Sequence, residues 1–408
     1  MPGDADSAVP FFRNAKLFRA YQAVRGFFRN PDVLRNTYQL CLCALIAGVA
    51  YLALSNAAEN LSRAKIATGF GFWDVTAGFD ISETLIAYSP QTSTYGRAFW
   101  VGLLNTLLVS ALGIIFATIL GFLVGIGRLS RNWLVARLAG FYVETIRNVP
   151  LLLQLLFWYN AVLKALPELH DSHVLFGGVF LSNRGLYLPK PIFEPNFWIV
   201  AVAFAFSVAA SVAIGVFAKR RQERTGQRLP VIAMTIVLVV GLPLLAFAAT
   251  GFPLAFDYPH MDRFNIRGGM ERLPEFMALL FALAIYTAAF IAEAVRAGIL
   301  AVAKGQTEAA YALGLRPSPT LRLVIIPQAM RVIIPPLTNQ YLNLTKNSSL
   351  AVAIGYPDLV QIFTGTVLNQ TGQAVEIVVL TMAVYLAISL VTSLAMNWYN
   401  ARIALTER

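Results

Sequence analysis

Residues 301–331 read AVAKGQTEAAYALGLRPSPTLRLVIIPQAMR, and this stretch differs in character from the apolar sequence on either side of it. It begins as a short alanine-rich segment, reaches Gly314, and enters a second apolar run through Pro327. Alanine favours helix, whereas glycine commonly ends one because it adopts left-handed conformations without steric penalty. The pattern predicts a small helix, a turn and a second helix between two long apolar segments.

The whole chain has the composition of a membrane protein. Of its 408 residues, 57% are hydrophobic and 13% are charged, whereas soluble domains average roughly 45–50% apolar and about 25% charged residues. Only helices and closed barrels satisfy every backbone hydrogen bond inside lipid. The apolar runs are long and do not alternate with polar residues, so the sequence predicts an all-α polytopic membrane protein.

Eight apolar runs are each near the length of about 20 residues that a transmembrane helix needs. They predict membrane spans at residues 37–55, 98–126, 149–167, 196–218, 230–250, 276–300, 323–343 and 374–399. Residues 134–147 have apolar positions at helical spacing and predict a surface helix that leads into the third span. The seventh span contains Pro327, Pro335 and Pro336. We expect it to be broken and lined by protein, because the carbonyls that proline frees need neighbours.

The basic residues follow the pattern of a membrane protein rather than that of a nucleic-acid-binding protein. The formal net charge is +11, and arginine and lysine cluster before the first span, after the second and fourth, around residues 296–322 and at the C-terminus. Counted from a cytoplasmic N-terminus, eight spans place every cluster on the same side, as the positive-inside rule requires. We therefore expect cytoplasmic N- and C-termini, contact with membrane lipid and no nucleic-acid partner.

The segment quoted first carries a specific motif. Three residues separate Glu308-Ala309-Ala310 from Gly314, and nine more precede a Val-Ile-Ile-Pro run that ends at Pro327. This spacing resembles the EAA loop of type I ABC importer permeases, in which the final run is Ile-x-Leu-Pro. Small alanines let a helix lie deep in a groove of another protein, and a carboxylate near the helix start suits a basic partner. The resemblance implies a cytoplasmic coupling helix within residues 302–327, with ATPase contacts from Gly305, Glu308, Ala309, Ala310, Gly314 and Pro327.

Three further stretches are similar to the polar and opine amino-acid branch of these permeases. They are ETIRNVPLLLQLLFWYN, FIAEAVRAGILAVAKGQTEAAYALGL and LTKNSSLAVAIGYPDLV. The extra length of the chain resembles one permease subunit of the general L-amino-acid importers of Gram-negative bacteria. The expected organisation is a cytoplasmic segment (1–36), an extra span with a periplasmic loop (37–97), the first part of the permease core (98–167), a two-span insertion (168–275) and the second part of the core (276–408).

The resemblance implies a permease subunit of an ATP-driven importer that moves amino acids from periplasm to cytoplasm across the bacterial inner membrane. Such a subunit does no covalent chemistry, so no catalytic residues are expected. The sequence contains no G-x-x-x-x-G-K-[ST] phosphate loop, so ATP and Mg are expected on a partner and no cofactor on this chain. The expected partners are two ABC ATPase subunits, a second permease subunit that is a different chain, and a periplasmic amino-acid-binding protein.

Polar residues inside the spans are candidates for the substrate pathway, because such residues are costly in lipid and mark functional sites by default. An amino acid is a zwitterion, so its passage requires partners for a carboxylate and for an ammonium group. Hydrogen bonding between helices, typically worth under about 2 kcal/mol per bond, is the alternative explanation and stays open. The candidates are Gln154, Tyr159 and Asn160 in the third span, and Thr338, Asn339, Asn343 and Lys346 in a cluster that also holds Gln340 and Asn347.

Two charged residues and three histidines have simpler interpretations. Glu293 and Arg296 lie three positions apart in the sixth span, which puts them on one helical face and predicts a structural ion pair near its inner end. His170, His173 and His260 lack the spacing of a metal site, so no metal is expected.

Two other classes of membrane protein compete with an ABC permease. A self-sufficient secondary amino-acid transporter is the alternative function; it would show inverted repeats and charged residues deep in the spans, and the sequence shows neither. A membrane-embedded enzyme would need His, Asp or Glu clustered at one depth, and no such cluster is visible. Copurification of an ATPase and a second permease with this chain would distinguish the three classes.

Overall fold

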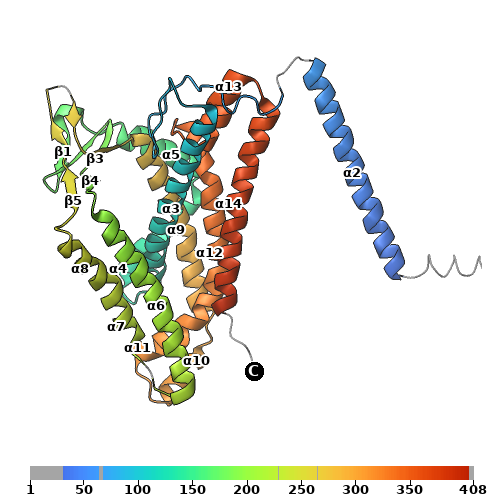
Figure 1. Cartoon of the computed structure of the whole chain (residues 1–408). Helices are drawn as coiled ribbons and strands as arrows, with labels where there is room; N and C mark the ends of the chain where they lie inside the picture. Colours follow the sequence, from blue (N-terminus) through green and yellow to red (C-terminus); the bar gives the residue numbers. More distant parts are fainter. Residues whose placement is uncertain (1–30, 64–67, 228, 264, 404–408) are drawn as a thin grey trace, which may run out of the picture. The chain divides into compact units, whose positions relative to one another are not determined.

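The computed structural model describes residues 31–63, 68–227, 229–263 and 265–403. They belong to two compact units, Met1–Phe70 with Thr371–Gln373, and Gly71–Gln370 with Ala374–Arg408. The smaller unit contains α2 (Pro31–Arg63), shown in blue in Figure 1. Its residues Leu34–Ala57 are apolar and long enough to cross a membrane, and an ion pair of 2.6 Å joins Glu59 to Arg63 one turn later.

The larger unit is mainly helical (Figure 1). Its α-helices are α3 (Tyr95–Gly127), α4 (Trp133–Asn148), α5 (Leu151–Leu156), α6 (Phe197–Thr225), α7 (Val231–Ile236), α8 (Leu242–Ala249), α9 (Pro274–Leu300), α10 (Lys304–Ala312), α11 (Pro317–Thr320), α12 (Ile326–Asn347), α13 (Leu368–Thr371) and α14 (Ala374–Ile403). Tighter or wider helical turns connect several of them: the π-helices η1 (Phe157–Leu163), η3 (Val237–Gly241), η4 (Leu321–Ile325) and η6 (Gln361–Val367), and the 3₁₀-helices η2 (Leu169–Asp171) and η5 (Ser348–Ala353).

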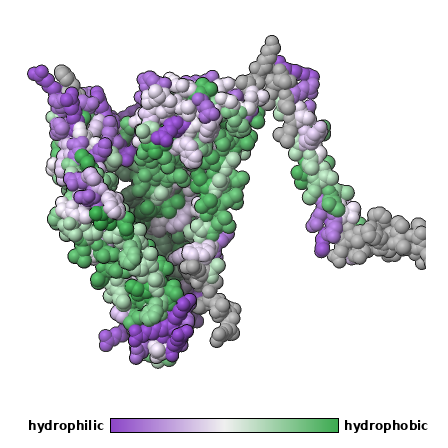
Figure 2. Space-filling view, viewed as in Figure 1, coloured by the Kyte–Doolittle hydropathy of each residue, from purple (hydrophilic) through white to green (hydrophobic). Residues whose placement is uncertain are grey.

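Among the described residues, seven helical segments are long and apolar enough to cross a membrane, which confirms the polytopic α-helical class. They are Leu34–Ala57, Tyr95–Gly127, Phe197–Thr225, Val231–Ala249, Pro274–Leu300, Pro317–Ala353 and Ala374–Ala401. On the face shown in Figure 2, hydrophobic residues cover the sides of the visible helices, and hydrophilic residues gather at the Arg-rich end of α6 and around the strands. This distribution is the one expected of helices that meet lipid laterally and water at their ends.

The third predicted span, 149–167, is shorter than expected. The apolar helix there covers Leu151–Leu163, which reaches about 20 Å at 1.5 Å per residue, against about 30 Å of hydrocarbon. It begins directly after Pro150, and Lys164 follows its last residue. The preceding α4 also packs on α9, where Tyr142 donates to the carbonyl of Ile285 at 2.6 Å.

The prediction that the seventh span is broken is wrong. The chain stays helical from Pro317 to Ala353, and Pro335 and Pro336 lie inside α12. Proline removes a backbone donor and crowds the preceding turn. The π-helix η4 directly precedes α12 and Pro327, and a wider turn of this kind accommodates such a mismatch. Pro335 and Pro336 are both exposed in this chain.

Helix α9 lies at the centre of the larger unit and packs against both α3 and α12 (Figure 1). Close approach of the backbones explains the glycines of α3: a Cβ at Gly121 would lie 2.6 Å from Cβ of Ile291. On the other side of α9, a Cβ at Gly298 would lie 2.3 Å from Cγ1 of Ile333 on α12. Small residues at such contacts are the usual means of helix association in membranes, and they fix α12 firmly on α9.

The insertion between η1 and α9 contains small antiparallel sheets as well as the predicted helices. The strands are β1 (His173–Leu175), β2 (Val179–Ser182), β3 (Gly185–Leu188), β4 (Lys190–Phe193), β5 (Leu254–Asp257), β6 (His260–Met261), β7 (Ile266–Arg267) and β8 (Met270–Arg272). The sheet orders are β1-β2-β3-β8, β4-β5 and β6-β7. Strands that precede α6 in the sequence pair with strands that follow α8: β3 pairs with β8, and β4 pairs with β5. This pairing joins the two ends of the α6–α8 hairpin near the start of α9.

Candidate functional site

A polar cavity of about 220 Å³ lies between α9 and α12. Tyr286, Thr287 and Phe290 of α9 form one wall, and Gln340, Asn343 and Asn347 of α12 form the other. The α12 residues lie three and four positions apart, which places them on one helical face. Amide groups both donate and accept hydrogen bonds, and the two aromatic side chains add an apolar surface, so the cavity offers both kinds of contact to a small polar molecule.

The face of α12 beside this cavity is polar and exposed. Asn339, Asn343 and Lys346 follow one another at helical spacing, and all three are exposed in this chain. The opposite face is apolar and buried, and it contains Ile333, Ile334, Leu337 and Leu344. Exposed amides and an ammonium group on a membrane helix are unfavourable in lipid. This face must therefore meet water or another protein.

Thr338 does not share this exposed face. Its side chain is half-buried, and Oγ1 donates to the carbonyl of Ile334 at 3.1 Å. Threonine commonly makes this bond within its own helix. Of the four seventh-span candidates, the structure therefore places Asn339, Asn343 and Lys346 on the exposed face and directs Thr338 toward its own backbone.

The third-span candidates lie at other places. The amide nitrogen of Gln154 donates to the carbonyls of Ile146 and Val149, both at 2.9 Å, where α4 passes into α5. These bonds satisfy carbonyls at a helix end that have no partner within the helix. Gln154 is also buried, and its contacts are those of a structural residue.

Tyr159 and Asn160 lie in η1, near the start of α9. The Tyr159 hydroxyl donates to Oε1 of Glu275 at 2.6 Å, and the ammonium of Lys164 lies 4.2 Å from the Tyr159 ring centre. Asn160 is exposed and donates to the carbonyl of Leu156 at 3.1 Å. This cluster lies near Glu275, in the first turn of α9, whereas the α9–α12 cavity begins at Tyr286.

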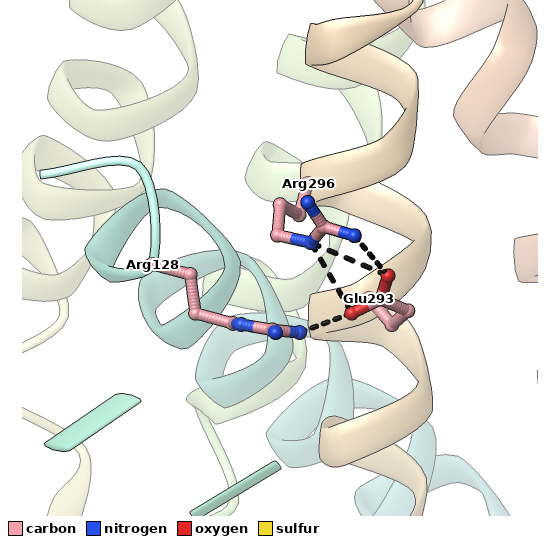
Figure 3. Close-up of polar contacts among 3 residues, drawn as sticks. All are labelled: Arg128, Glu293 and Arg296. Carbon is pink, nitrogen blue, oxygen red and sulfur yellow. Dashed lines mark hydrogen bonds and ion pairs between the residues drawn. The ribbon is translucent and has the colours of Figure 1, made fainter. Parts of the chain in front are cut away.

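Glu293 is the centre of a charged cluster at the other end of α9 (Figure 3). Arg296 donates to Oε1 of Glu293 at 2.6 Å, and Arg128, at the end of α3, pairs with Oε2. A carboxylate between two guanidinium groups forms charge-assisted hydrogen bonds with both. The spacing in the sequence predicts the Arg296 contact, but Arg128 is remote in the chain and gives no such signal.

The motif segment forms the predicted helix, turn and second helix. Helix α10 contains Gly305, Glu308, Ala309 and Ala310, and Gly314 follows with φ of 75°, a conformation that glycine adopts readily. Helix α11 then starts at Pro317, a residue well suited to the first helical turn. Glu308 and Ala309 are exposed and Ala310 is buried, so α10 rests on the protein through one face only.

The outer face of this helix–turn–helix carries unpartnered apolar side chains. Leu313 is 82% exposed and Tyr311 is 50% exposed. Gln328 of α12 donates to Oε1 of Gln306 at 3.1 Å and links α10 to the transmembrane helix. Exposed apolar residues beside a carboxylate are typical of a protein-binding surface. Force applied to α10 would pass directly to α12.

A buried polar network, which the sequence did not reveal, holds the segment after η5. Asp358 is fully buried and accepts hydrogen bonds from the backbone N–H of Gln361 at 2.8 Å and from the Tyr385 hydroxyl at 3.1 Å. Nearby, Asn105 of α3 donates to the carbonyls of Glu83 and Pro357. Burial raises the pKa of Asp358 to about 7. The network ties the segment around Asp358 to α3 and α14.

The apolar segment of residues 350–363 is too short to span a membrane alone. Within it, Tyr356, Leu359 and Phe363 are fully buried. Gly102 of α3 admits this segment, because a Cβ there would lie 3.0 Å from Cα of Leu359.

The described residues contain no group of three or more His, Cys, Asp or Glu that could hold a metal ion.

Comparison with known protein families gives one match over the second half of the chain. The family described as "Binding-protein-dependent transport system inner membrane component" matches residues 211–405. The matched region includes α9, the motif segment and α12, and therefore both the polar cavity and the helix–turn–helix.

Three relatives are similar over almost their whole length. The "General L-amino acid transport system permease protein AapQ" of Rhizobium johnstonii is 54% identical over 94% of this chain and 96% of the relative. The "Putative amino-acid ABC transporter permease protein YhdX" of Escherichia coli is 52% identical over 93% of this chain and 97% of the relative. The "Glutamate/glutamine/aspartate/asparagine transport system permease protein BztB" of Rhodobacter capsulatus is 45% identical over 90% of this chain and 92% of the relative.

Proposed function

This chain belongs to the family of amino-acid ABC transporter permeases, and from that premise we propose that it forms part of the path by which amino acids enter a bacterial cell. It is a multi-pass membrane protein and a transport subunit. Membership of this family excludes the alternative of a self-sufficient secondary transporter. The observation that best supports a path on this chain is the polar cavity between α9 and α12.

The chemistry of the cavity suits an amino acid. The amides of Gln340, Asn343 and Asn347 can accept from an ammonium group and donate to a carboxylate. Lys346 follows on the exposed face of α12, where its ammonium can attract the carboxylate that all amino acids share. The rings of Tyr286 and Phe290 offer contact to apolar side chains, which supports transport of more than one class of amino acid.

A second permease subunit would cover the exposed face of α12. The face is polar, and it lies beside a cavity that is open in the single chain, so a partner would complete the wall. The similarity to subunits of general amino-acid importers favours a partner that is a different chain. The path would then run between the two subunits.

ATP hydrolysis would act through α10. We place one ATPase subunit beneath this chain and one beneath its partner, with Glu308 and the exposed Leu313 in the ATPase groove. Movement of α10 would reach α12 through the Gln306–Gln328 hydrogen bond and the short turn at Gly314. ATP and Mg would bind to the ATPases, and a periplasmic binding protein would deliver the amino acid at the strand-bearing end.

The orientation follows from charge. The Arg-rich end of α6, with Lys219, Arg220 and Arg221, would lie in the cytoplasm together with α10 and both termini. Helices α4, α5 and η1 together would make the third crossing, because their contacts reach Phe290 and also Glu275 on α9. Eight crossings of the inner membrane result.

Copurification tests this proposal. An affinity tag on this chain, expressed from its own chromosomal position, should recover a second permease in an amount equal to the tagged chain and about two ABC ATPase subunits for each of them. Glu308→Arg should reduce the recovered ATPase while the second permease remains. Recovery of this chain without any ATPase, under conditions that keep the second permease bound, would contradict the assignment.

A further inference from the structure

A cavity of about 320 Å³ near the end of α9 has no role in the path described above. It lies between α4 and the ends of α3 and α9. Three arginines line it, one from each region: Arg137, Arg128 and Arg296. The lining also includes Glu144 and Phe141 of α4.

The cavity carries an excess of positive charge. Arg128 and Arg296 share a single carboxylate, that of Glu293 (Figure 3). Within the described ranges, neither Arg137 nor Glu144 makes an ion pair. Three guanidinium groups thus gather around one shared carboxylate and one unpaired carboxylate. Guanidinium groups have donors in a fork geometry that matches phosphate and carboxylate oxygens, so the cavity is suited to an anion.

The surroundings of the cavity are apolar on the side away from the bundle. Phe141 is 69% exposed, and Trp133, Leu134 and Leu138 of α4 are exposed as well. A free anion in water would gain nothing from these side chains. A molecule with an anionic head and long apolar chains would satisfy the arginines and the α4 surface together.

We propose that this cavity binds the phosphate head group of an anionic phospholipid, and that the acyl chains of this lipid lie along the exposed apolar side chains of α4. Basic pockets at the membrane surface are suited to such head groups, and each nearby Lys or Arg strengthens binding about fivefold. The lipid connects α4 to the ends of α3 and α9, and so stabilises the corner from which the third crossing starts.

Native mass spectrometry of the purified full chain with its partner subunits tests the proposal. Dioleoyl phosphatidylglycerol and dioleoyl phosphatidylcholine are each titrated separately in detergent, and inorganic phosphate is then added to the complex that has bound phosphatidylglycerol. We expect phosphatidylglycerol to bind at least fivefold more tightly than phosphatidylcholine, and inorganic phosphate not to displace it at equal concentration. Equal binding of the two lipids would overturn the proposal. Displacement by inorganic phosphate would identify a free-phosphate site and reject the lipid.

Three variants assign the binding to this cavity. Arg137→Gln should weaken phosphatidylglycerol binding about fivefold, whereas Arg131→Gln, which alters an exposed arginine outside the cavity, should change it less than twofold. Glu144→Gln removes the unpaired carboxylate and should tighten binding, a result that damaged folding cannot produce. If Arg137→Gln cannot be purified, the test rests on Glu144→Gln. Unchanged or weaker binding of phosphatidylglycerol by that variant rejects the site.

Discussion

Asn343 is the residue that most clearly separates a transport path from helix packing. It lines the α9–α12 cavity and is exposed on the polar face of α12. A residue that only joined helices would have its amide satisfied by a neighbouring helix. Because the amide remains available, its removal should affect the substrate more than the fold.

Asn343→Leu should therefore reduce uptake of polar amino acids, such as glutamine, about tenfold more than uptake of leucine. A polar side chain that loses its partner in the path is penalised by about 1–3 kcal/mol, and an apolar side chain loses nothing. Asn397→Leu, at an exposed position on α14, is the matched control and should leave both rates unchanged. Equal loss for both substrates, with poor membrane expression, would indicate packing alone.

Asp358 gives a pH-dependent prediction. Burial raises its pKa to about 7 in the folded protein, above the unfolded value of about 4. The contribution of Asp358 to the free energy of unfolding is therefore fully present below the unfolded pKa of about 4. It is lost as pH rises from there through about 7, by up to about 1.4 kcal/mol per pH unit. Asp358→Asn does not ionise. We therefore expect the unfolding temperature of the variant, minus that of the natural protein, to be larger at pH 8 than at pH 5. If this difference does not change with pH, the buried-charge explanation is rejected.

Some of these residues could be identified from the sequence, and others could not. Asn343 and Lys346 stand out because polar residues are rare in apolar runs. Phe290 and Tyr286 do not, because an aromatic residue in a span is ordinary. Arg128 pairs with Glu293 only because α3 and α9 pack together. The two residues are far apart in the sequence, so their spacing could not predict this contact.

At the scale of elements, the helix–turn–helix of residues 304–320 is the part whose form follows most directly from sequence. Alanines, a glycine at φ of 75° and a proline at the next helix start each act locally. The strands were missed for the opposite reason. They contain two to four residues each, and β3 pairs with β8, on the far side of the α6–α8 hairpin.

Glu308→Arg tests the exposed helix α10. Its side chain points away from the protein, so the variant should reach the membrane in normal amounts and keep its unfolding temperature within about 1 °C, as surface substitutions generally do. Uptake should fall at least tenfold, together with ATP hydrolysis stimulated by the binding protein. Glu223→Arg, an exposed charge reversal on α6, is the control. Normal uptake in the α10 variant would exclude α10 as the coupling helix.

At the scale of the whole molecule, the orientation of the larger unit rests on the positive-inside rule. With Cys41 and Cys43 replaced by serine, Gln91→Cys should react with a membrane-impermeant maleimide added to the periplasmic side. Gln222→Cys should react only after the membrane is opened. Both positions are exposed, so access depends on sidedness alone, and the reverse pattern would invert the proposed topology.

The most direct measurement is amino-acid uptake into proteoliposomes that contain the complex purified through this chain. Radiolabelled glutamine and leucine would be supplied outside with the loaded binding protein, and ATP with Mg inside. We predict accumulation that requires internal ATP, is unaffected by collapse of proton and sodium gradients, and is lost with Glu308→Arg. Accumulation driven by an ion gradient without ATP would contradict the assignment of this chain as an ABC importer permease.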